Sequence, residues 1–322
     1  MIGEIEIISV GKSLPEKILT NTDLESMVDT SDEWITKRTG IKRRRVCTDE
    51  NARSLATKAS LQALERAGIK PSDLGFIVAS TVTNTEITPS LAGGVQREIG
   101  SECPCMDVGA GCSGFIYALV TASGLMETLE CEYALVIAAE VLSDYVDWSE
   151  RSTCVLFGDG AGAVVLKRGR RGLHYPILEG SADIDDTIII KRELRKTPFN
   201  NVEDIKPEYL RLKGQDVFIY ATSALESIMD KMQRLCGDKP FTKVIPHQAN
   251  EKIIDYVIRK TGYEKDQFFI NIDEYANTSS ATIPIALCDA QESGWLKHGD
   301  RLALIGFGSG LTCGGVVVDW MI

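Results

Sequence analysis

The chain has 322 residues, of which 44% are hydrophobic and 25% charged, and its formal net charge is −11. This balance is typical of a globular protein, and the acidic charge argues against a general nucleic-acid binder, which needs clustered Lys and Arg. No apolar run approaches about 18 residues, so we expect no transmembrane helix and no membrane partner. The 9 cysteines lack metal-ligand spacing, which predicts no metal site and reduced thiols, as is usual in the cytoplasm.

Short β-branched runs alternate with helical patterns along the first half of the chain. The patterns predict helices at 52–68, 90–100 and 113–129, and buried strands at 74–81, 133–140 and 161–168. Such alternation is typical of βαβ units. We therefore expect an α/β fold whose sheet is mostly parallel and covered by helices.

The second half of the chain repeats the order of the first. The stretch "FTKVIPHQ" answers "LGFIVAST", "QFFINIDEYANTSSATIP" answers the strand and helix around residue 112, and "FGSGLTCGGVVVDW" answers "FGDGAGAVVLKR". We predict two similar α/β halves, residues 1–172 and 173–322, whose equivalent turns meet across a pseudo-twofold axis. The polar stretch at about 185–210 lies outside the repeat and is predicted to be an insertion near a site entrance.

The stretch "DVGAGCSGF" places Cys112 between a predicted strand and the helix over 113–129. Gly109 and Gly111 permit a sharp turn between the two. A thiol at a helix N-terminus meets unpaired N–H groups, which lower its pKa and favour the thiolate. A nucleophile and a small packing residue both fit this stretch when it is taken alone.

Two further polar residues follow predicted strands in the second half. His247 comes after "KVIP", and Asn277 lies at the turn that matches the Cys112 turn. Each alone fits a structural role, as a buried histidine or as an Asx turn or helix cap. Together with Cys112 they indicate a site, to which "GFGSGLTCGG" would add backbone N–H groups for an oxyanion. No acidic partner for the imidazole is obvious, which favours a His–Asn pair that donates hydrogen bonds to a developing enolate.

Six motifs occur in order along the chain: "TSDEWITKRTGIKRRR", "GAGCSGF", "LFGDGAGAVVL", "PHQAN", "NTSSATIP" and "GFGSGLTCGG". With these motifs the chain closely resembles β-ketoacyl-acyl-carrier-protein synthase III from about residue 2 to residue 322. The resemblance implies the thiolase fold, with five αβαβα layers, and a cytoplasmic homodimer without a permanently bound cofactor.

The resemblance also implies an acyltransferase that initiates fatty-acid synthesis. Cys112 would be acylated by acyl-CoA, and the acyl group would then condense with malonyl-acyl carrier protein as carbon dioxide leaves. Backbone N–H groups of Cys112 and Ser309 would hold the oxyanion. His247 and Asn277 would hydrogen-bond the malonyl thioester carbonyl.

The substrate contacts are likewise implied by the resemblance. CoA would contact Thr30, Trp34, Arg38, Arg151, Gly214, Phe218, Ala249 and Asn250. Trp34 and Arg151 would sandwich the adenine, although Trp34 alone also fits a core aromatic. Thr88 and Leu142 would line the acyl pocket, and Thr88 stands where phenylalanine is familiar, which suggests more room than an acetyl group needs.

Docking of the acidic carrier protein would use Lys252, Arg259 and Lys260, which form a local basic patch on an acidic chain. Glu251 and Lys252 stand where the family pattern has an apolar residue and an arginine, which leaves the identity of the carrier protein open.

Three other functions stay open from the sequence. One is a related condensing enzyme of secondary metabolism with a non-acetyl starter. Another is a papain-like thiol hydrolase, because the order and spacing of Cys112, His247 and Asn277 match that class, although the local papain signature is absent. The third is a non-enzymatic binding protein on the same fold.

Overall fold

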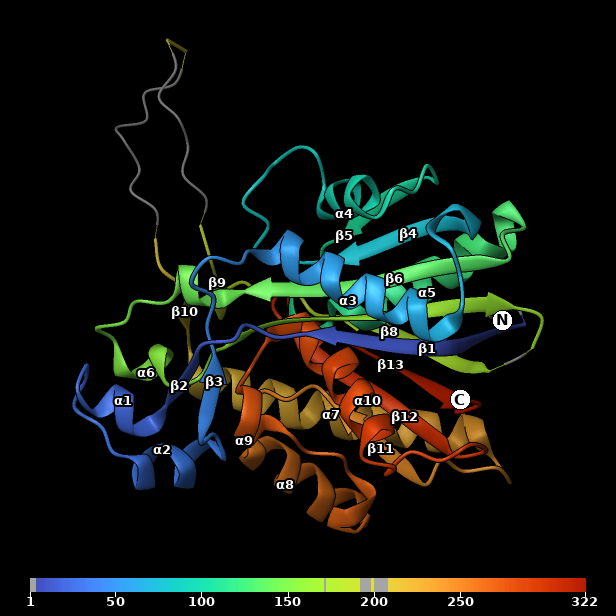
Figure 1. Cartoon of the computed structure of the whole chain (residues 1–322). Coiled ribbons are helices and arrows are strands. Elements are labelled where there is room, and N and C mark those ends of the chain that lie inside the picture. Colours follow the sequence, from blue (N-terminus) through green and yellow to red (C-terminus); the bar gives the residue numbers. More distant parts are fainter. Residues whose placement is uncertain (1–3, 171, 192–197, 200–207) are drawn as a thin grey trace.

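Two mixed sheets form the centre of the fold (Figure 1). The structure is a computed structural model that describes residues 4–170, 172–191, 198–199 and 208–322. The first sheet has the strand order β1 (Ile5–Ser13), β7 (Asp159–Arg168), β6 (Tyr133–Val141), β4 (Leu74–Ser80) and β5 (Cys105–Val108). The second has the order β11 (Lys243–Pro246), β12 (Arg301–Gly308), β13 (Thr312–Asp319) and β8 (Leu173–Gly180). Two short antiparallel pairs are β2 (Ile18–Thr20) with β3 (Arg43–Arg45), and β9 (Ile188–Ile189) with β10 (Arg211–Leu212).

Helices cover both outer faces and fill the space between the sheets. On the first sheet lie α3 (Ala52–Ala67) and α4 (Leu91–Ile99), and on the second lie α7 (Gly214–Cys236) and α8 (Glu251–Thr261). Between the sheets lie α5 (Gly114–Leu129) and α10 (Thr282–Glu292). These layers are the αβαβα arrangement of the thiolase fold, which confirms the predicted fold class. The short helices are α1 (Asn21–Glu25), α2 (Asp32–Thr39), α6 (Arg151–Cys154) and α9 (Ile272–Tyr275).

The predicted helices and strands of the first half are confirmed to within two residues. The prediction of a mostly parallel sheet is wrong. Parallel pairs join β4 to β5, β4 to β6 and β11 to β12, whereas β7 and β13 run antiparallel to both of their neighbours. The reason is that β7 and β13 follow their predecessors without a long crossover helix, so the chain returns in the opposite direction.

The second half follows the order of the first, with one difference. The strand expected before Asn277 is reduced to an isolated parallel bridge between Val244 and Phe268. We propose the division into 1–172 and 173–322 on the ground that each large sheet draws its strands from one side of it. The insertion expected over 185–210 lies partly outside the described residues.

The helices that cover the outer faces begin differently from the two central helices. The side chain of Asn51 caps α3 by accepting the N–H of Ser54 at 2.9 Å. Neither α5 nor α10 has a side-chain cap, and each follows a 3-10 turn, η2 (Gly111–Ser113) or η5 (Ser279–Ala281). Both central helices therefore begin with first-turn N–H groups that no capping side chain satisfies.

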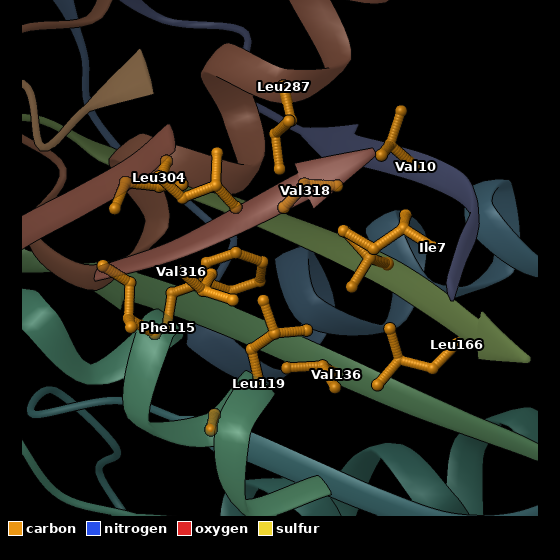
Figure 2. Close-up of a cluster of buried hydrophobic side chains, with 14 of the residues drawn as sticks. Ile7, Val10, Phe115, Leu119, Val136, Leu166, Leu287, Leu304, Val316 and Val318 are labelled. Carbon is orange, nitrogen blue, oxygen red and sulfur yellow. The ribbon is translucent and has the colours of Figure 1, made fainter. Parts of the chain in front are cut away.

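The central helices are fixed by the core between the sheets. Figure 2 shows Phe115 and Leu119 of α5 pointing towards Val136 of β6 and Val316 of β13, and all four side chains are fully buried. Truncating a buried phenylalanine to alanine typically costs about 3–5 kcal/mol. The start of α5 therefore has a fixed position relative to both sheets.

Among the described helices, one stretch, Gly111–Leu129, is long and apolar enough by length and composition to cross a membrane. This stretch coincides with η2 and α5, and half of it is buried inside the protein. The position of α5 between two sheets accounts for its hydropathy.

Candidate active site

A cavity of about 540 Å³ opens where strands of both sheets end and the central helices begin. Its walls include Cys112 before α5, His247 after β11, Asn277 before η5 and Ser309 after β12. The structure thus brings together four predicted site residues that lie far apart in the sequence.

Cys112 lies in the η2 turn directly before α5. Gly111 adopts a left-handed φ of 53°, which a residue with a side chain rarely adopts. Gly109 has no such φ, and a Cβ added there would meet no atom within 4 Å. Only one of the two glycines that precede Cys112 is therefore required by the turn.

The end of β12 lies backbone to backbone against η2. A Cβ added at Gly308 would lie 2.5 Å from the nitrogen of Cys112, and one added at Gly111 would lie 2.9 Å from the nitrogen of Ser309. Side chains do not fit at either glycine, so the N–H groups of Cys112 and Ser309 are held near each other. Two backbone donors at one place are the geometry that stabilises an oxyanion.

The expectation of a lowered pKa for Cys112 is wrong. Burial raises the pKa of the Cys112 thiol to about 11, and the nearby Glu140 carboxyl raises it further, although the Ser279 hydroxyl lowers it. A helix terminus contributes only about 0.3–1 kcal/mol at an exposed site, which is too little to offset the burial of the sulfur. The loss of hydration outweighs the helix terminus, and the resting group is a neutral thiol.

His247 is held from two sides, and only 1% of its surface is exposed. Its backbone N–H donates to the carbonyl of Ile305 at 2.8 Å, and its Nδ1 lies 2.7 Å from Oγ1 of Thr282. Because Thr282 donates its own proton to the carbonyl of Ser279 at 3.0 Å, we assign the hydrogen on the imidazole to Nδ1. Nε2 has no hydrogen-bond partner among the described residues, and burial lowers the pKa of His247 to about 3. The imidazole is neutral, with a free lone pair.

Asn277 is oriented by Ser279, a residue that the sequence analysis did not single out. The backbone N–H of Ser279 donates to Oδ1 of Asn277 at 2.8 Å, which fixes the amide and leaves Nδ2 as its donor. The main chain of Asn277 is held by Leu156 and Gly158. The signal for Ser279 was its place two residues after Asn277, where an Asx turn has its N–H donor.

The outer residues predicted to bind CoA cluster on α2, α6 and the segment before α2. The guanidinium carbon of Arg151 lies 4.8 Å from the centre of the Trp34 ring, and that of Arg38 lies 5.8 Å from it. Oγ1 of Thr30 is buried without a partner among the described residues. A base held between Trp34 and Arg151 needs two contacts of about 3.5–4 Å, so Arg151 has to move outward to admit adenine.

The inner residues predicted to bind CoA line the cavity itself. They are Gly214, Phe218, Ala249 and Asn250. Oδ1 of Asn250 caps α8 by accepting the N–H of Lys252 at 2.9 Å, which leaves its amide nitrogen available. The described part of the insertion also forms cavity wall, through Ile188, Ile189, Ile190, Leu210 and Leu212.

The two residues predicted for the acyl pocket differ. Leu142 lines the cavity. Thr88 is exposed and is not among the residues that line the cavity of this single chain, so its part in the acyl pocket stays a prediction. The loop that carries Thr88 is joined to α3, where Glu86 forms an ion pair with Arg53.

The residues predicted for carrier-protein docking lie on one helix. Lys252, Arg259 and Lys260 are all exposed on α8, which begins beside the cavity. Glu251, which departs from the family pattern, accepts a bond from Lys265 at 2.8 Å. Because Glu251 is paired with Lys265, it does not neutralise the predicted basic residues.

The chemistry available in the cavity is that of a partly buried thiol beside an imidazole, an amide and two backbone donors. Such a set suits attack on a thioester and stabilisation of the oxyanion that follows. Among the described residues, no group of three or more His, Cys, Asp or Glu side chains is placed to hold a metal ion.

Comparison with known proteins agrees with this chemistry. Two family models match, 3-oxoacyl-[acyl-carrier-protein] synthase III at residues 106–180 and its C-terminal part at residues 238–320. The chain is 41% identical to the β-ketoacyl-[acyl-carrier-protein] synthase III of Clostridium acetobutylicum, with 99% of each covered. It is 40% identical to that of Clostridium botulinum strain Langeland, with 100% of each covered.

Solved structures show the same relationship. The 3-oxoacyl-[acyl-carrier-protein] synthase III of Aquifex aeolicus VF5 superposes with a TM-score of 0.90 at 39% identity, covering 98% of this chain and 100% of that one. The priming β-ketosynthase of the R1128 polyketide biosynthetic pathway superposes with a TM-score of 0.91 at 29% identity, covering 99% and 97%. Because the polyketide enzyme is less similar to this chain than the synthases III of Clostridium acetobutylicum and Aquifex aeolicus are, the comparison does not favour the secondary-metabolism alternative. The thiolase fold overturns the papain-like hydrolase, and the relatives overturn the non-enzymatic binding protein. The chain belongs to the β-ketoacyl-acyl-carrier-protein synthase III family of acyltransferases.

Proposed function

We propose that acyl-CoA acylates Cys112 and that the acyl group then condenses with malonyl-acyl carrier protein, the condensation that initiates fatty-acid synthesis. The observation that carries the proposal is the shared cavity of Cys112, His247, Asn277 and Ser309. Acyl-CoA is a substrate in this scheme, and no resident cofactor takes part.

In the first half-reaction the sulfur of Cys112 attacks the thioester carbon as its proton passes to Nε2 of His247. The carbonyl oxygen becomes an oxyanion, held by the N–H groups of Cys112 and Ser309. The carbon–sulfur bond to CoA then breaks, and the leaving thiolate takes the proton from His247. The products are acyl-Cys112 and free CoA.

In the second half-reaction His247 and Asn277 donate hydrogen bonds to the malonyl thioester carbonyl. The electron pair of the breaking carbon–carbon bond forms the enolate as carbon dioxide leaves, and the enolate attacks acyl-Cys112. This step uses the other neutral tautomer of His247, which forms when Nε2 takes a proton from solvent in the cavity and Nδ1 releases its own. Thr282 accommodates the change, because its hydroxyl can donate to Nδ1 in that tautomer. The bond between the acyl carbon and the sulfur of Cys112 then breaks, which releases the 3-ketoacyl product, and the thiolate of Cys112 takes a proton from solvent to restore the resting site.

Substrate binding follows from the same placement. We assign CoA contacts to Thr30, Trp34, Arg38, Arg151, Gly214, Phe218, Ala249 and Asn250, the acyl pocket to Thr88 and Leu142, and carrier-protein docking to Lys252, Arg259 and Lys260. The exposed cations of α8 support the last assignment, because an acidic partner is steered by local positive charge.

The proposal includes a cytoplasmic homodimer. Among the described strands, β5 pairs only with β4, so its outer edge is available for pairing with another chain. Near this edge Met106 is 41% exposed and Ile87 is 81% exposed, which supports an interface there. All nine cysteines are free, as expected in a reducing compartment.

The experiment is to mix the protein with acetyl-CoA and record the intact mass. We expect one acyl adduct on Cys112, none in Cys112→Ser, and release of a 3-ketoacyl-carrier protein when malonyl-acyl carrier protein is added. Absence of the adduct in the unaltered protein would overturn the proposal. Repeating the measurement with longer and branched acyl-CoA thioesters identifies the primer.

A further inference from the structure

A buried carboxyl, Glu140, lies behind the cavity and has no part in the half-reactions above. It is on β6, is 0% exposed, and does not line the cavity. A buried carboxyl needs hydrogen-bond partners to offset its lost hydration. The partners of Glu140 therefore show what it is built to hold.

The two oxygens of Glu140 face opposite halves of the chain. Oε2 accepts the N–H of Val82 at 3.0 Å and the hydroxyl of Thr83 at 2.9 Å, both from the loop after β4. Oε1 accepts the hydroxyls of Ser280 at 2.5 Å and Ser279 at 3.2 Å, both from η5. One carboxyl thus ties η5 of the second half to the first sheet.

The segment that Glu140 holds is strained. Ala276 has a φ of 57° and Ser279 a φ of 49°, although neither is glycine, and Asn277 lies between them. Such conformations cost roughly 1–3 kcal/mol each and persist only where surrounding contacts enforce them. Ser279 is also the residue whose N–H fixes the amide of Asn277, at 2.8 Å.

We infer that Glu140 is a positioning residue for decarboxylation: by anchoring Ser279 and Ser280 it holds the strained turn whose N–H aims Nδ2 of Asn277 into the cavity. The inference rests on the proposed function, since it concerns the half-reaction that uses Asn277. The backbone of Cys112 is positioned separately, by η2 and the end of β12. Glu140 acts on the Cys112 thiol through its charge, which raises the pKa of that thiol, and Ser280→Ala keeps this charge. Loss of the anchor should therefore impair the second half-reaction and spare the first.

The test uses two variants of the full-length protein. Ser280→Ala removes one hydroxyl that lies outside the cavity, and Glu140→Gln keeps the shape of the side chain. In Glu140→Gln the amide oxygen has to face the N–H of Val82, so the NH₂ group faces the serines. The serines can then only accept from this NH₂ group, and weaker neutral bonds replace their two bonds to a carboxylate oxygen. Asp159→Asn is the matched control, a buried carboxyl on the neighbouring strand that bonds Ser143 and the N–H of Cys47 instead of η5.

Two rates are measured for each protein: formation of acyl-Cys112 from acetyl-CoA, by intact mass, and release of carbon dioxide from malonyl-acyl carrier protein. We expect both variants to lose about tenfold in carbon dioxide release. Acylation should stay within about twofold in Ser280→Ala, and it should not fall in Glu140→Gln, which removes the charge that raises the pKa of Cys112. The double variant should lose no more than either single one, because both changes break the same anchor. Asp159→Asn should leave both rates unchanged or lower both by the same factor.

A positioning role for Glu140 is overturned if the two rates fall together, if neither falls, if only acylation falls, or if the losses in the double variant multiply. Failure of the unaltered protein to form acyl-Cys112 would instead remove the proposed function, and the inference with it.

Discussion

Gly308→Ala is the substitution that most directly tests the backbone contact between β12 and η2. The new Cβ would lie 2.5 Å from the nitrogen and 3.1 Å from the Cα of Cys112, and 3.0 Å from the nitrogen of Ser113. Ordinary contact begins at 3.4 Å. The neighbours are backbone atoms that cannot rotate away, so η2 or the end of β12 has to move by almost 1 Å.

That displacement has two expected effects. Overpacking of a buried site costs about 1–3 kcal/mol of folding free energy. Displacement of a reacting group by about 1 Å costs about a hundredfold in rate, close to the loss of one oxyanion donor, which is about 2.7–4 kcal/mol. We therefore expect Gly308→Ala to fold with a lowered Tm and to form acyl-Cys112 about a hundredfold more slowly.

The assay is rapid-quench intact mass after mixing with acetyl-CoA, with Tm measured in parallel. Gly109→Ala is the control, because its Cβ would meet nothing within 4 Å although it lies three residues before Cys112. It should acylate at the unaltered rate. A folded Gly308→Ala protein that also acylates at that rate would show that the contact of β12 with η2 does not control the oxyanion.

Three regions of the site and its surroundings give four further predictions. Because burial raises the pKa of Cys112 to about 11, its alkylation by iodoacetamide, counted against Cys112→Ser, should rise about tenfold per pH unit up to pH 9; a plateau below pH 8 would contradict a neutral resting thiol. Thr282→Val leaves Nδ1 of His247 without its hydrogen-bond partner, so the barrier to carbon dioxide release should rise by about 1–3 kcal/mol; an unchanged rate would exclude Thr282 from orienting the ring. Trp34→Ala removes one stacking face, so the KM for acyl-CoA should rise while kcat stays constant. Lys252→Glu should weaken the binding of malonyl-acyl carrier protein more at low salt than at high salt, and it should leave acylation by acyl-CoA unchanged.

The proposed catalytic positions could be predicted because each lies at a turn of a repeated unit, although the strand expected before Asn277 is only an isolated bridge. Cys112, His247 and Asn277 all lie at turns that a duplicated α/β pattern brings to one end of the sheets. The spacing of apolar residues also gave the helices of the first half. Strand direction in the mixed sheets was not predictable in this way, because a buried strand has the same apolar run whichever way its neighbour points.

The features of the site that the sequence does not predict depend on contacts with the other half of the chain. Glu140 lies within an apolar strand pattern, and its role follows only from the serines of η5 that lie against it. The pKa of Cys112 was predicted with the wrong sign because a helix terminus is a local feature, whereas the burial that dominates comes from the walls of the cavity. Position 308 likewise requires glycine because the backbone of Cys112 and Ser113 lies against it.

The neutral resting state of the site constrains how acylation proceeds. Burial raises the pKa of Cys112 and lowers the pKa of His247, so both shifts oppose transfer of the proton from sulfur to the imidazole before the attack begins. The proton therefore leaves sulfur as the carbon–sulfur bond forms, when the oxyanion already meets the N–H groups of Cys112 and Ser309. The same dry surroundings favour the second half-reaction, because a malonyl carboxylate deprived of water loses carbon dioxide more readily, provided that a donor such as Asn277 receives the charge.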